Sequence, residues 1–141
     1  MKIEILYHTD IEPIQPLLNG DWIDLRASKD YTLHAGEFTL IDLGVSMKLP
    51  DGYEAHLAPR SSTFKKWGIL QVNSVGVIDN SFSGNNDIWC MPAFATRDTV
   101  IHKNDRIAQF RIMPKMPPVD MVKVDNLDSP NRGGFGSTGT N

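Results

Sequence analysis

The sequence has a single cysteine, Cys90, in 141 residues. One cysteine cannot form a disulfide within the chain, which excludes the disulfide-stapled class of small secreted domains and is typical of a reducing cytoplasm. No apolar run approaches the roughly 18 to 20 residues that a membrane span needs. The first ten residues, MKIEILYHTD, hold two acidic residues and no apolar core of the kind that signal peptides have. We therefore expect a cytoplasmic protein that makes no contact with a membrane.

An excess of positive charge is also missing. The chain has 14 Lys and Arg residues against 17 Asp and Glu, a net charge of −3, whereas proteins that bind long nucleic acids carry a basic surface. This balance disfavours a small β-barrel that binds single-stranded nucleic acid. A single nucleotide needs only a few local cations and backbone amides, so that class of ligand stays open.

Common catalytic and metal-binding motifs are absent as well. The sequence contains no H-E-x-x-H, no G-x-S-x-G and no Walker loop, and one cysteine cannot supply the zinc ligands of a nucleotide deaminase. Residues 134–139 do match G-x-G-x-x-G, but that loop needs a following helix or strand and only two residues remain. We expect no metal held by side chains alone, while magnesium arriving with a phosphate ligand is a separate case.

The pattern of apolar residues indicates an all-β fold. Nine prolines and eleven glycines leave few windows for a helix of ordinary length. Alternating apolar residues predict strands at 3–7, 38–49, 69–78, 87–95, 105–113 and 119–124. Pro-Asp-Gly at 50–52 predicts a chain reversal, and 61–68 predicts one helical turn. Many short strands at roughly ten-residue spacing favour a sandwich, barrel or jelly roll.

The composition changes from about Pro114 onward. The final stretch, DSPNRGGFGSTGTN, is poor in side chains that could pack a core. We expect one β domain over residues 1–128 and a flexible, glycine-rich tail over residues 129–141.

Five short segments combine residues that a globular core does not require. Each alone has a structural explanation: Asp24 as a turn carboxylate, Ser61 as a helix cap, Asp79 at the end of a strand, or Gln109 as an outward-facing strand residue. The segments are DWIDLRA (21–27), PRSST (59–63), NSVGVIDNSFSG (73–84), NDRIAQF (104–110) and the tail.

Together and in this order, the segments resemble the five motifs of the trimeric dUTPases, which cleave dUTP to dUMP and pyrophosphate. The resemblance extends from about residue 20 to 139 and is closest to bacterial and phage members of the family. It implies a distorted jelly-roll or β-barrel-like fold. It also implies a role in keeping uracil out of DNA and in supplying dUMP for dTMP synthesis.

The resemblance implies the parts of a hydrolytic mechanism. Attack of water on the α-phosphorus needs an oriented water, a base and positive charge over the phosphate oxygens. Asp79 matches the carboxylate that activates the water. Asp24 matches the aspartate that touches magnesium through its coordinated waters, with Mg²⁺ chelated by the three phosphates.

The same resemblance assigns the phosphate contacts. Arg60, Ser61 and Gln109 match phosphate-contacting positions, and a guanidinium fork with hydroxyl and amide donors suits phosphate oxygens. For Asp105 and Arg106 the interpretation stays open between supporting the site and contacting phosphate.

Selection of the nucleoside is assigned to the segment around the base. Asn73 aligns with the asparagine used at the uracil, in a hairpin whose backbone reads the base edge. Phe82 takes a position usually held by tyrosine, where the ring packs on deoxyribose and excludes a 2′-hydroxyl. A donor or acceptor left unpaired against the wrong base costs about 1–3 kcal/mol, which is enough to discriminate.

The tail is expected to close over the substrate. Its glycines permit positive φ angles, so successive N–H groups can wrap phosphate oxygens. Phe135 would stack on the uracil, Arg132 would meet the γ-phosphate, and Gly136, Ser137 and Thr138 would contact the substrate through amide and hydroxyl donors. Arg132 stands only three residues before Phe135, whereas the commoner family pattern has five.

The resemblance also implies a homotrimer. Each active site would be built from several subunits, with the tail of one chain closing over the site of a neighbour. A cyclic trimer is a permitted closed symmetry.

Two alternative functions stay open. A dCTP deaminase of the same superfamily is disfavoured by the GVID aspartate and by the tail. A module that senses dUTP without hydrolysing it is disfavoured by Asp79, because a sensor needs no base to activate water.

Overall fold

Short strands make up most of the regular structure, as the alternating pattern predicts. The computed structural model describes residues 1–136, with eleven strands and one short helix. The strands are β1 (Glu4–Tyr7), β2 (Ile23–Arg26), β3 (Tyr31–Leu33), β4 (Phe38–Asp42), β5 (Val45–Lys48), β6 (Tyr53–Pro59), β7 (Ile69–Gln71), β8 (Gly76–Ile78), β9 (Cys90–Ala95), β10 (Thr99–Ile101) and β11 (Arg106–Pro114). The helix is α1 (Thr63–Trp67). The all-β prediction with one helical turn is confirmed.

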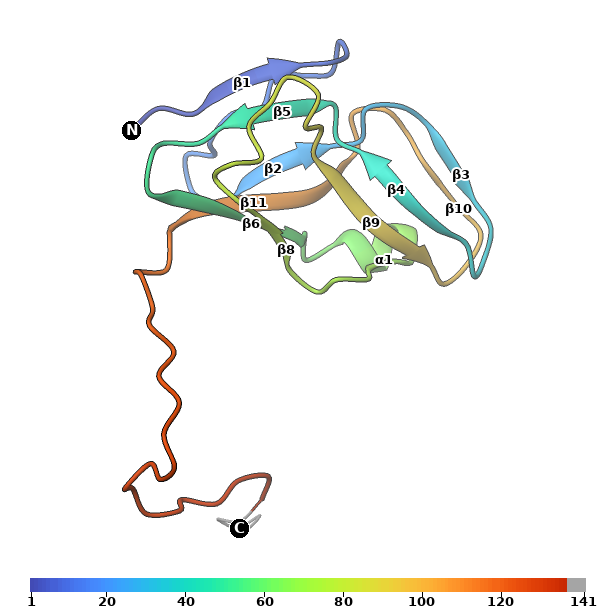
Figure 1. Ribbon diagram of the computed structural model, residues 1–141. Coiled ribbons are helices and arrows are strands. Elements are labelled where there is room, and N and C mark those ends of the chain that lie inside the picture. Colours follow the sequence, from blue (N-terminus) through green and yellow to red (C-terminus); the bar gives the residue numbers. More distant parts are fainter. Residues whose placement is uncertain (137–141) are drawn as a thin grey trace.

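The strands pair antiparallel in four groups (Figure 1). The largest sheet has the order β2-β11-β6-β8, and a second has the order β4-β9-β7. The remaining pairs are β1 with β5 and β3 with β10. β11 is the longest strand, with nine residues, and it pairs with both β2 and β6. Sheets that fold over one another in this way are the layered arrangement of a jelly-roll-like β protein.

The core lies between the sheets and follows the period of two that strands impose. On β6, Ala55 and Leu57 are buried while their neighbours are only partly covered. Trp89 and Phe110 are the two largest fully buried side chains, and their rings meet edge to face at 5.1 Å between centroids. Burying a side chain of this size stabilises the fold by about 1.5–3 kcal/mol.

A tight reversal at residues 50–52 sets where β6 begins. Gly52 has φ of 84°, a conformation that glycine adopts without steric cost, and the Tyr53 amide donates to the Pro50 carbonyl at 3.2 Å. The predicted Pro-Asp-Gly turn is confirmed.

The helix α1 is anchored by its first residue. The buried Thr63 hydroxyl accepts a hydrogen bond from the Arg60 amide at 2.9 Å and donates to the Ile107 carbonyl of β11 at 2.8 Å. The N-cap position belongs to Ser62, which makes no side-chain cap bond, so the interpretation of Ser61 as the cap is wrong. The helix stops at Gly68, whose φ of 65° lies in the left-handed region. Within residues 1–136 no helix is long and apolar enough to cross a membrane.

The expected strand at residues 119–124 is wrong. Within the described residues, regular structure ends at Pro114, and residues 115–136 leave the body as an extended segment (Figure 1). A strand needs partners for its backbone N–H and C=O groups, and residues 119–124 make no backbone hydrogen bond within residues 1–136. Alternation of apolar residues alone could not reveal that the partner is missing. The expected boundary between residues 128 and 129 falls inside this extension.

Replacing Thr63 by valine should lower the free energy of unfolding by about 1–3 kcal/mol, because the Arg60 amide and the Ile107 carbonyl lose their buried partner. Thr39→Val is the matched control, since Thr39 makes no side-chain hydrogen bond among the described residues. We expect the control to stay within about 0.5 kcal/mol of the parent. Equal losses for both variants in urea unfolding would contradict the anchoring role.

Candidate active site

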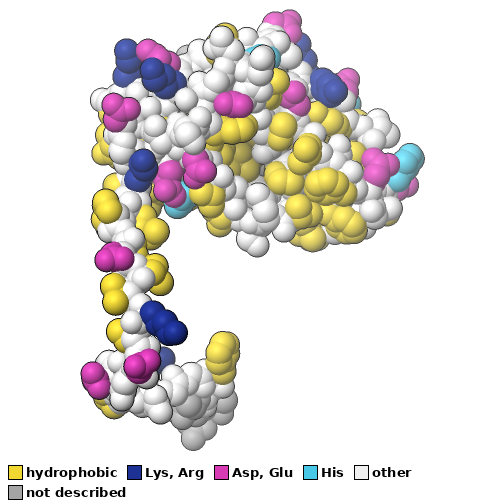
Figure 2. All heavy atoms as spheres, viewed as in Figure 1, with side chains coloured by type: hydrophobic (Ala, Val, Ile, Leu, Met, Phe, Trp, Pro, Cys, Tyr) yellow, Lys and Arg dark blue, Asp and Glu magenta, His cyan; other side chains and the backbone are white. Residues whose placement is uncertain are grey.

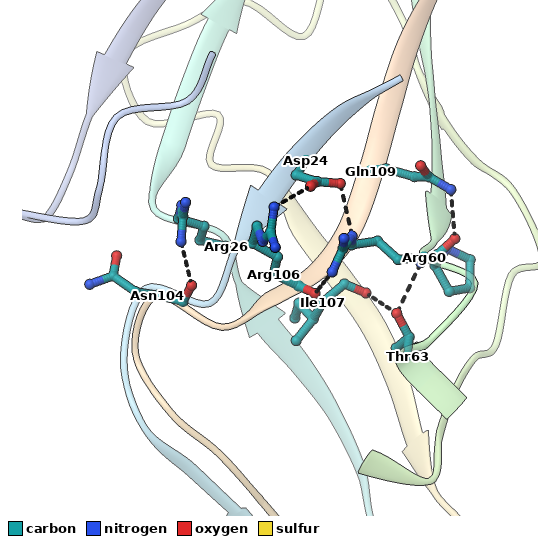
Figure 3. A network of polar contacts seen from close by, with 9 residues as sticks. Asp24, Arg26, Arg60, Thr63, Asn104, Arg106, Ile107 and Gln109 are labelled. Carbon is teal, nitrogen blue, oxygen red and sulfur yellow. Dashed lines mark hydrogen bonds and ion pairs between the residues drawn. The ribbon is translucent and has the colours of Figure 1, made fainter. Parts of the chain in front are cut away.

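Asp24 lies at the centre of a polar cluster on the four-stranded sheet (Figure 3). Its side chain comes from β2 and is 10% exposed. One carboxylate oxygen contacts Nε of Arg60 at 2.9 Å, and the other contacts Nη1 of Arg106 at 3.2 Å. Pairing a buried carboxylate with two guanidinium groups offsets the cost of removing its charge from water.

Strand register explains how distant segments meet at this carboxylate. Asp24 lies opposite Gln109 in the pairing of β2 with β11. The register shifts between Arg106 and Ala108, and such an irregularity re-aims the side chain beside it. Gln109 donates through Nε2 to the Pro59 carbonyl at 3.1 Å.

Arg60 is held from both of its ends. Its amide is fixed by Thr63, and its Nη1 donates to the Arg106 carbonyl at 3.2 Å (Figure 3). Ser61 follows it with an exposed side chain. The structure therefore brings Asp24, Arg60, Ser61 and Gln109 to one place, which we call the phosphate half after their predicted role.

A second group of predicted residues lines one cavity of about 370 Å³. Asn73, Asp79 and Phe82 all reach it, and Leu57 and Gly76 contribute to its wall. A volume of this order suits a small organic ligand such as a nucleoside. We call this group the nucleoside half.

Local geometry fixes the nucleoside half. Asn73 lies in the turn between β7 and β8, next to Ser74, whose φ of 54° turns the chain. The predicted hairpin is not a paired one, because β7 pairs with β9 and β8 pairs with β6; we keep the name hairpin for the turn at residues 72–75. A β-carbon at Gly76 would stand 3.2 Å from Cβ of Leu57, so glycine permits the close approach to β6. Asp79 follows β8 directly, and the Phe82 amide donates to the Asp79 carbonyl at 3.0 Å.

Two residues that the sequence reasoning missed support this half. Asn80 donates through Nδ2 to the Pro50 and Tyr53 carbonyls, both at 2.9 Å, and so fixes the loop after Asp79. Gln71 is buried beneath the hairpin, where its amide donates to backbone carbonyls. The available signal for Gln71 was a polar residue at an inward position of the apolar run Ile-Leu-Gln.

Cys90 also lines the cavity and is a free thiol. Burial raises its pKa above the ordinary value, and the nearby Asp42 charge adds to the increase. A thiol with a raised pKa stays protonated at neutral pH, which makes it a poor nucleophile. Its place in the cavity is that of a neutral wall residue.

One chain does not bring the two halves together. Asp24 belongs to β2 and Asp79 follows β8, and these strands form opposite edges of the sheet. Three inter-strand spacings of ~4.8 Å place the edges roughly 14 Å apart. The halves are also displaced along β6, because β8 pairs with Ala55 to Leu57 whereas Arg60 follows the last residue of β6.

The predicted tail contacts are not made within the chain either. Phe135 is fully exposed at the far end of the extended segment, with φ of 47°. Arg132 and Gly136 are also exposed, in the segment that leaves the body (Figure 1). The predicted contacts of Ser137 and Thr138 lie outside the described residues.

Comparison with known proteins places the chain among nucleotide hydrolases. The sequence model of the dUTPase family matches residues 22–139. The SPbeta prophage-derived deoxyuridine 5′-triphosphate nucleotidohydrolase of Bacillus subtilis is 56% identical over 141 residues, which are 99% of each chain. The deoxyuridine 5′-triphosphate nucleotidohydrolase of Neorickettsia sennetsu is 34% identical, over 99% of this chain and 96% of its own.

Solved structures share the fold. A variant of the dUTPase of Staphylococcus bacteriophage 80alpha, solved with dUpNHpp, matches with a TM-score of 0.80 and 18% identity over 99% of both chains. A variant of the dUTPase from phage phi11 of S. aureus, described with a structural Mg(II) ion, matches with a TM-score of 0.78 and 15% identity, covering 92% of this chain and 100% of its own. The family match and the full-length relatives show that the chain belongs to the dUTPase family, the hydrolases of dUTP.

Proposed function

We propose that this dUTPase cleaves dUTP to dUMP and pyrophosphate by attack of a water on the α-phosphorus, with Asp79 as general base. The observation that carries this proposal is the position of Asp79 in the same cavity as Asn73 and Phe82. A carboxylate at the wall of a nucleoside-sized cavity lies where the 5′ end of a bound deoxynucleoside would emerge. If the general base and the α-phosphate are held in a fixed relative orientation, the reaction no longer depends on a chance encounter between them.

Selection of uracil is proposed for the hairpin that carries Asn73. Asn73 and Gly76 both line the cavity, and a close fit of the hairpin to the base would exclude the methyl group of thymine. Fixed donors and acceptors of the hairpin would stay unpaired against cytosine, at a cost of about 1–3 kcal/mol each. Phe82 would pack on the deoxyribose, where a 2′-hydroxyl finds no room.

The phosphate half is suited to a triphosphate. Arg60 offers a planar fork of N–H donors, Ser61 an exposed hydroxyl, and Gln109 a side-chain amide. Arg106 stands beside the same carboxylate as Arg60, so its charge would also face the phosphates.

The residues present fit a magnesium ion that arrives with the substrate. Mg²⁺ keeps several waters and is commonly held by phosphates with one or two carboxylates. The two oxygens of Asp24 each accept one arginine contact, and a carboxylate has about four acceptor positions. Asp24 can therefore accept from metal-bound water while it keeps both arginines. When bound, the metal would neutralise phosphate charge and fix the conformation of the triphosphate chain.

We propose that a homotrimer completes the site, because one chain holds the two halves on opposite sheet edges. The outer face of the β4-β9-β7 sheet supports this. Figure 2 shows hydrophobic side chains gathered over this part of the body, and exposed apolar patches mark interaction surfaces. The exposed residues are Phe38, Leu40, Leu70, Val72 and Phe94. Leu40 also lines the cavity, so a subunit covering this face would reach the nucleoside half.

The extended segment is proposed to act between subunits. Apolar side chains along residues 115–127 are exposed within their own chain (Figure 2), and a neighbouring subunit could cover them. The tail at 129–141 would then bring Arg132, Phe135 and Gly136, followed by Ser137 and Thr138, over the neighbour's site. Closure of such a segment excludes water from the reaction.

The proposed place of action is the cytoplasm, where reducing conditions keep Cys90 a thiol. There the reaction would limit uracil in DNA and supply dUMP for dTMP synthesis.

Purified protein with magnesium should release pyrophosphate from dUTP and leave dCTP unchanged. Asp79→Asn should lower kcat by about 10²–10⁴-fold, because the amide cannot accept the proton of the attacking water. Binding of dUpNHpp, measured by calorimetry, should stay close to that of the parent, since the substitution preserves shape. Parent-like turnover by the variant would show that Asp79 is not the base, and a uridine product from dCTP would show a deaminase.

Mixing two inactive variants tests the shared site. Asp79→Asn lacks the base and Arg60→Ala lacks a phosphate contact. In a mixed trimer, some interfaces combine the unaltered nucleoside half of the Arg60→Ala chain with the unaltered phosphate half of the Asp79→Asn chain. Random assortment at equal amounts should restore roughly a quarter of the parent activity. Each site has about an even chance of an intact nucleoside half and about an even chance of an intact phosphate half, and it needs both. A co-refolded mixture no more active than its components would place both halves in one chain.

Truncation after Ser129 tests the tail. The shortened chain keeps every strand and α1, since regular structure ends at Pro114, so its thermal unfolding should match that of the parent. Its kcat/KM for dUTP should fall by about tenfold or more, because the substrate loses its cover and its orientation. Full activity of the truncated protein would remove the tail from the mechanism.

A further inference from the structure

Gln71 occupies an inward position in β7 that the strand pattern reserves for an apolar residue. Ile69, two residues earlier, is 1% exposed and Gln71 is 8% exposed, whereas Leu70 between them faces outward. The Gln71 amide nitrogen donates to the Leu57 carbonyl at 3.0 Å and to the Ser74 carbonyl at 3.4 Å. Both partners are acceptors, so only the NH₂ end of the side chain can face them.

The other end of this side chain has no partner. Oε1 of Gln71 is buried without a hydrogen bond among the described residues. An unpaired buried acceptor costs about 1–3 kcal/mol, and methionine would fill the same space without that cost. Packing alone therefore does not explain a glutamine here, and local departures of this kind are expected at functional positions.

One of the two hydrogen bonds joins the two sheets beneath the cavity, and the other holds the turn that follows β7. β7 belongs to the β4-β9-β7 sheet, while Leu57 belongs to β6 of the four-stranded sheet. Leu57 lies opposite Gly76, and both line the cavity together with Asn73. Ser74, the second acceptor, directly follows Asn73 and has the positive φ on which the hairpin turns.

We propose that Gln71 is a positioning residue for uracil selection: its amide fixes the 72–75 hairpin against β6, so that Asn73 and the hairpin backbone present the base with a narrow and rigid edge. The proposal rests on the proposed role of Asn73 in binding uracil. Gln71 acts through the hairpin and does not touch the substrate. When these hydrogen bonds of Gln71 are lost, the hairpin can move outward, and the site can then accommodate the methyl group of thymine.

Gln71→Met is the first test, because methionine matches the length and volume of glutamine and removes both donors. We expect KM for dUTP to rise by about tenfold, with kcat changed much less. The selectivity ratio, kcat/KM for dUTP divided by kcat/KM for dTTP, should fall by about tenfold, since a small displacement of a binding group has effects of this size.

The thermal stability of Gln71→Met should be equal to or above that of the parent, because the unpaired acceptor is gone. Tyr7→Phe is the control: it removes the hydroxyl that accepts a hydrogen bond from the Ile14 amide, neither residue lines the cavity, and the selectivity ratio should stay unchanged. Parent-like KM and selectivity for Gln71→Met would overturn the proposal, as would a loss of stability with unchanged selectivity.

Gln71→Glu gives a second readout, which decides the matter if the methionine variant does not fold. Burial raises the pKa of the introduced carboxyl. Below that pKa the protonated acid can donate to Leu57 or Ser74, and above it the carboxylate cannot donate and is repelled by both carbonyls. The dUTP-to-dTTP selectivity ratio of this variant should therefore increase as pH falls, while the parent ratio stays flat because the glutamine side chain does not titrate. A flat ratio for the variant would overturn the proposal.

Asn73→Ala separates this inference from the proposed base-binding role. Reduced selectivity of Asn73→Ala together with parent-like Gln71 variants would overturn only the role of Gln71. If Asn73→Ala itself kept the parent selectivity, the hairpin would not read the base, and the proposed function of that segment would fail.

Discussion

The pairing of β6 with β11 on one side and β8 on the other is the constraint on which the site depends. It fixes Arg60 at one end of β6 and Asp79 beside the other, and it places β2 with Asp24 at the far edge of the sheet. A register slip of one residue would turn each of these side chains to the opposite face. The core residues of β6 therefore position the chemistry as well as stabilising the fold.

Because this register separates the two halves, the proposed function requires that association of subunits bring them together. An extended segment with exposed apolar residues and a sheet face with the same property both occur in the chain. Each is costly for an isolated monomer, and each becomes favourable once a second copy covers it. In the proposed trimer, the contacts that cover this apolar surface would also complete the site.

Local sequence was sufficient to predict the parts that depend on neighbouring residues. The Pro-Asp-Gly turn, the helical turn after Pro59 and the position of Asp79 directly after a strand were predicted correctly, because each is set by a few adjacent residues. The strand at 119–124 was not, since a strand also requires a partner. Asn80 and Gln71 were missed for a related reason. Their carbonyl partners, Tyr53 and Leu57, are distant in sequence, and no local pattern identifies these partners.

The arginine pair on Asp24 shows how a binding site can be prepared before its ligand arrives. Two guanidinium groups would repel each other if left alone, and the carboxylate between them holds both in place. Arg60 uses Nε for Asp24 and Nη1 for a backbone carbonyl, yet a guanidinium has five N–H donors. Donors therefore remain for phosphate oxygens without breaking the ion pair. A site that already holds its charges in place spends little reorganisation energy when a substrate binds. Under the proposed function, this explains why a carboxylate lies at the centre of a cluster that would bind an anion.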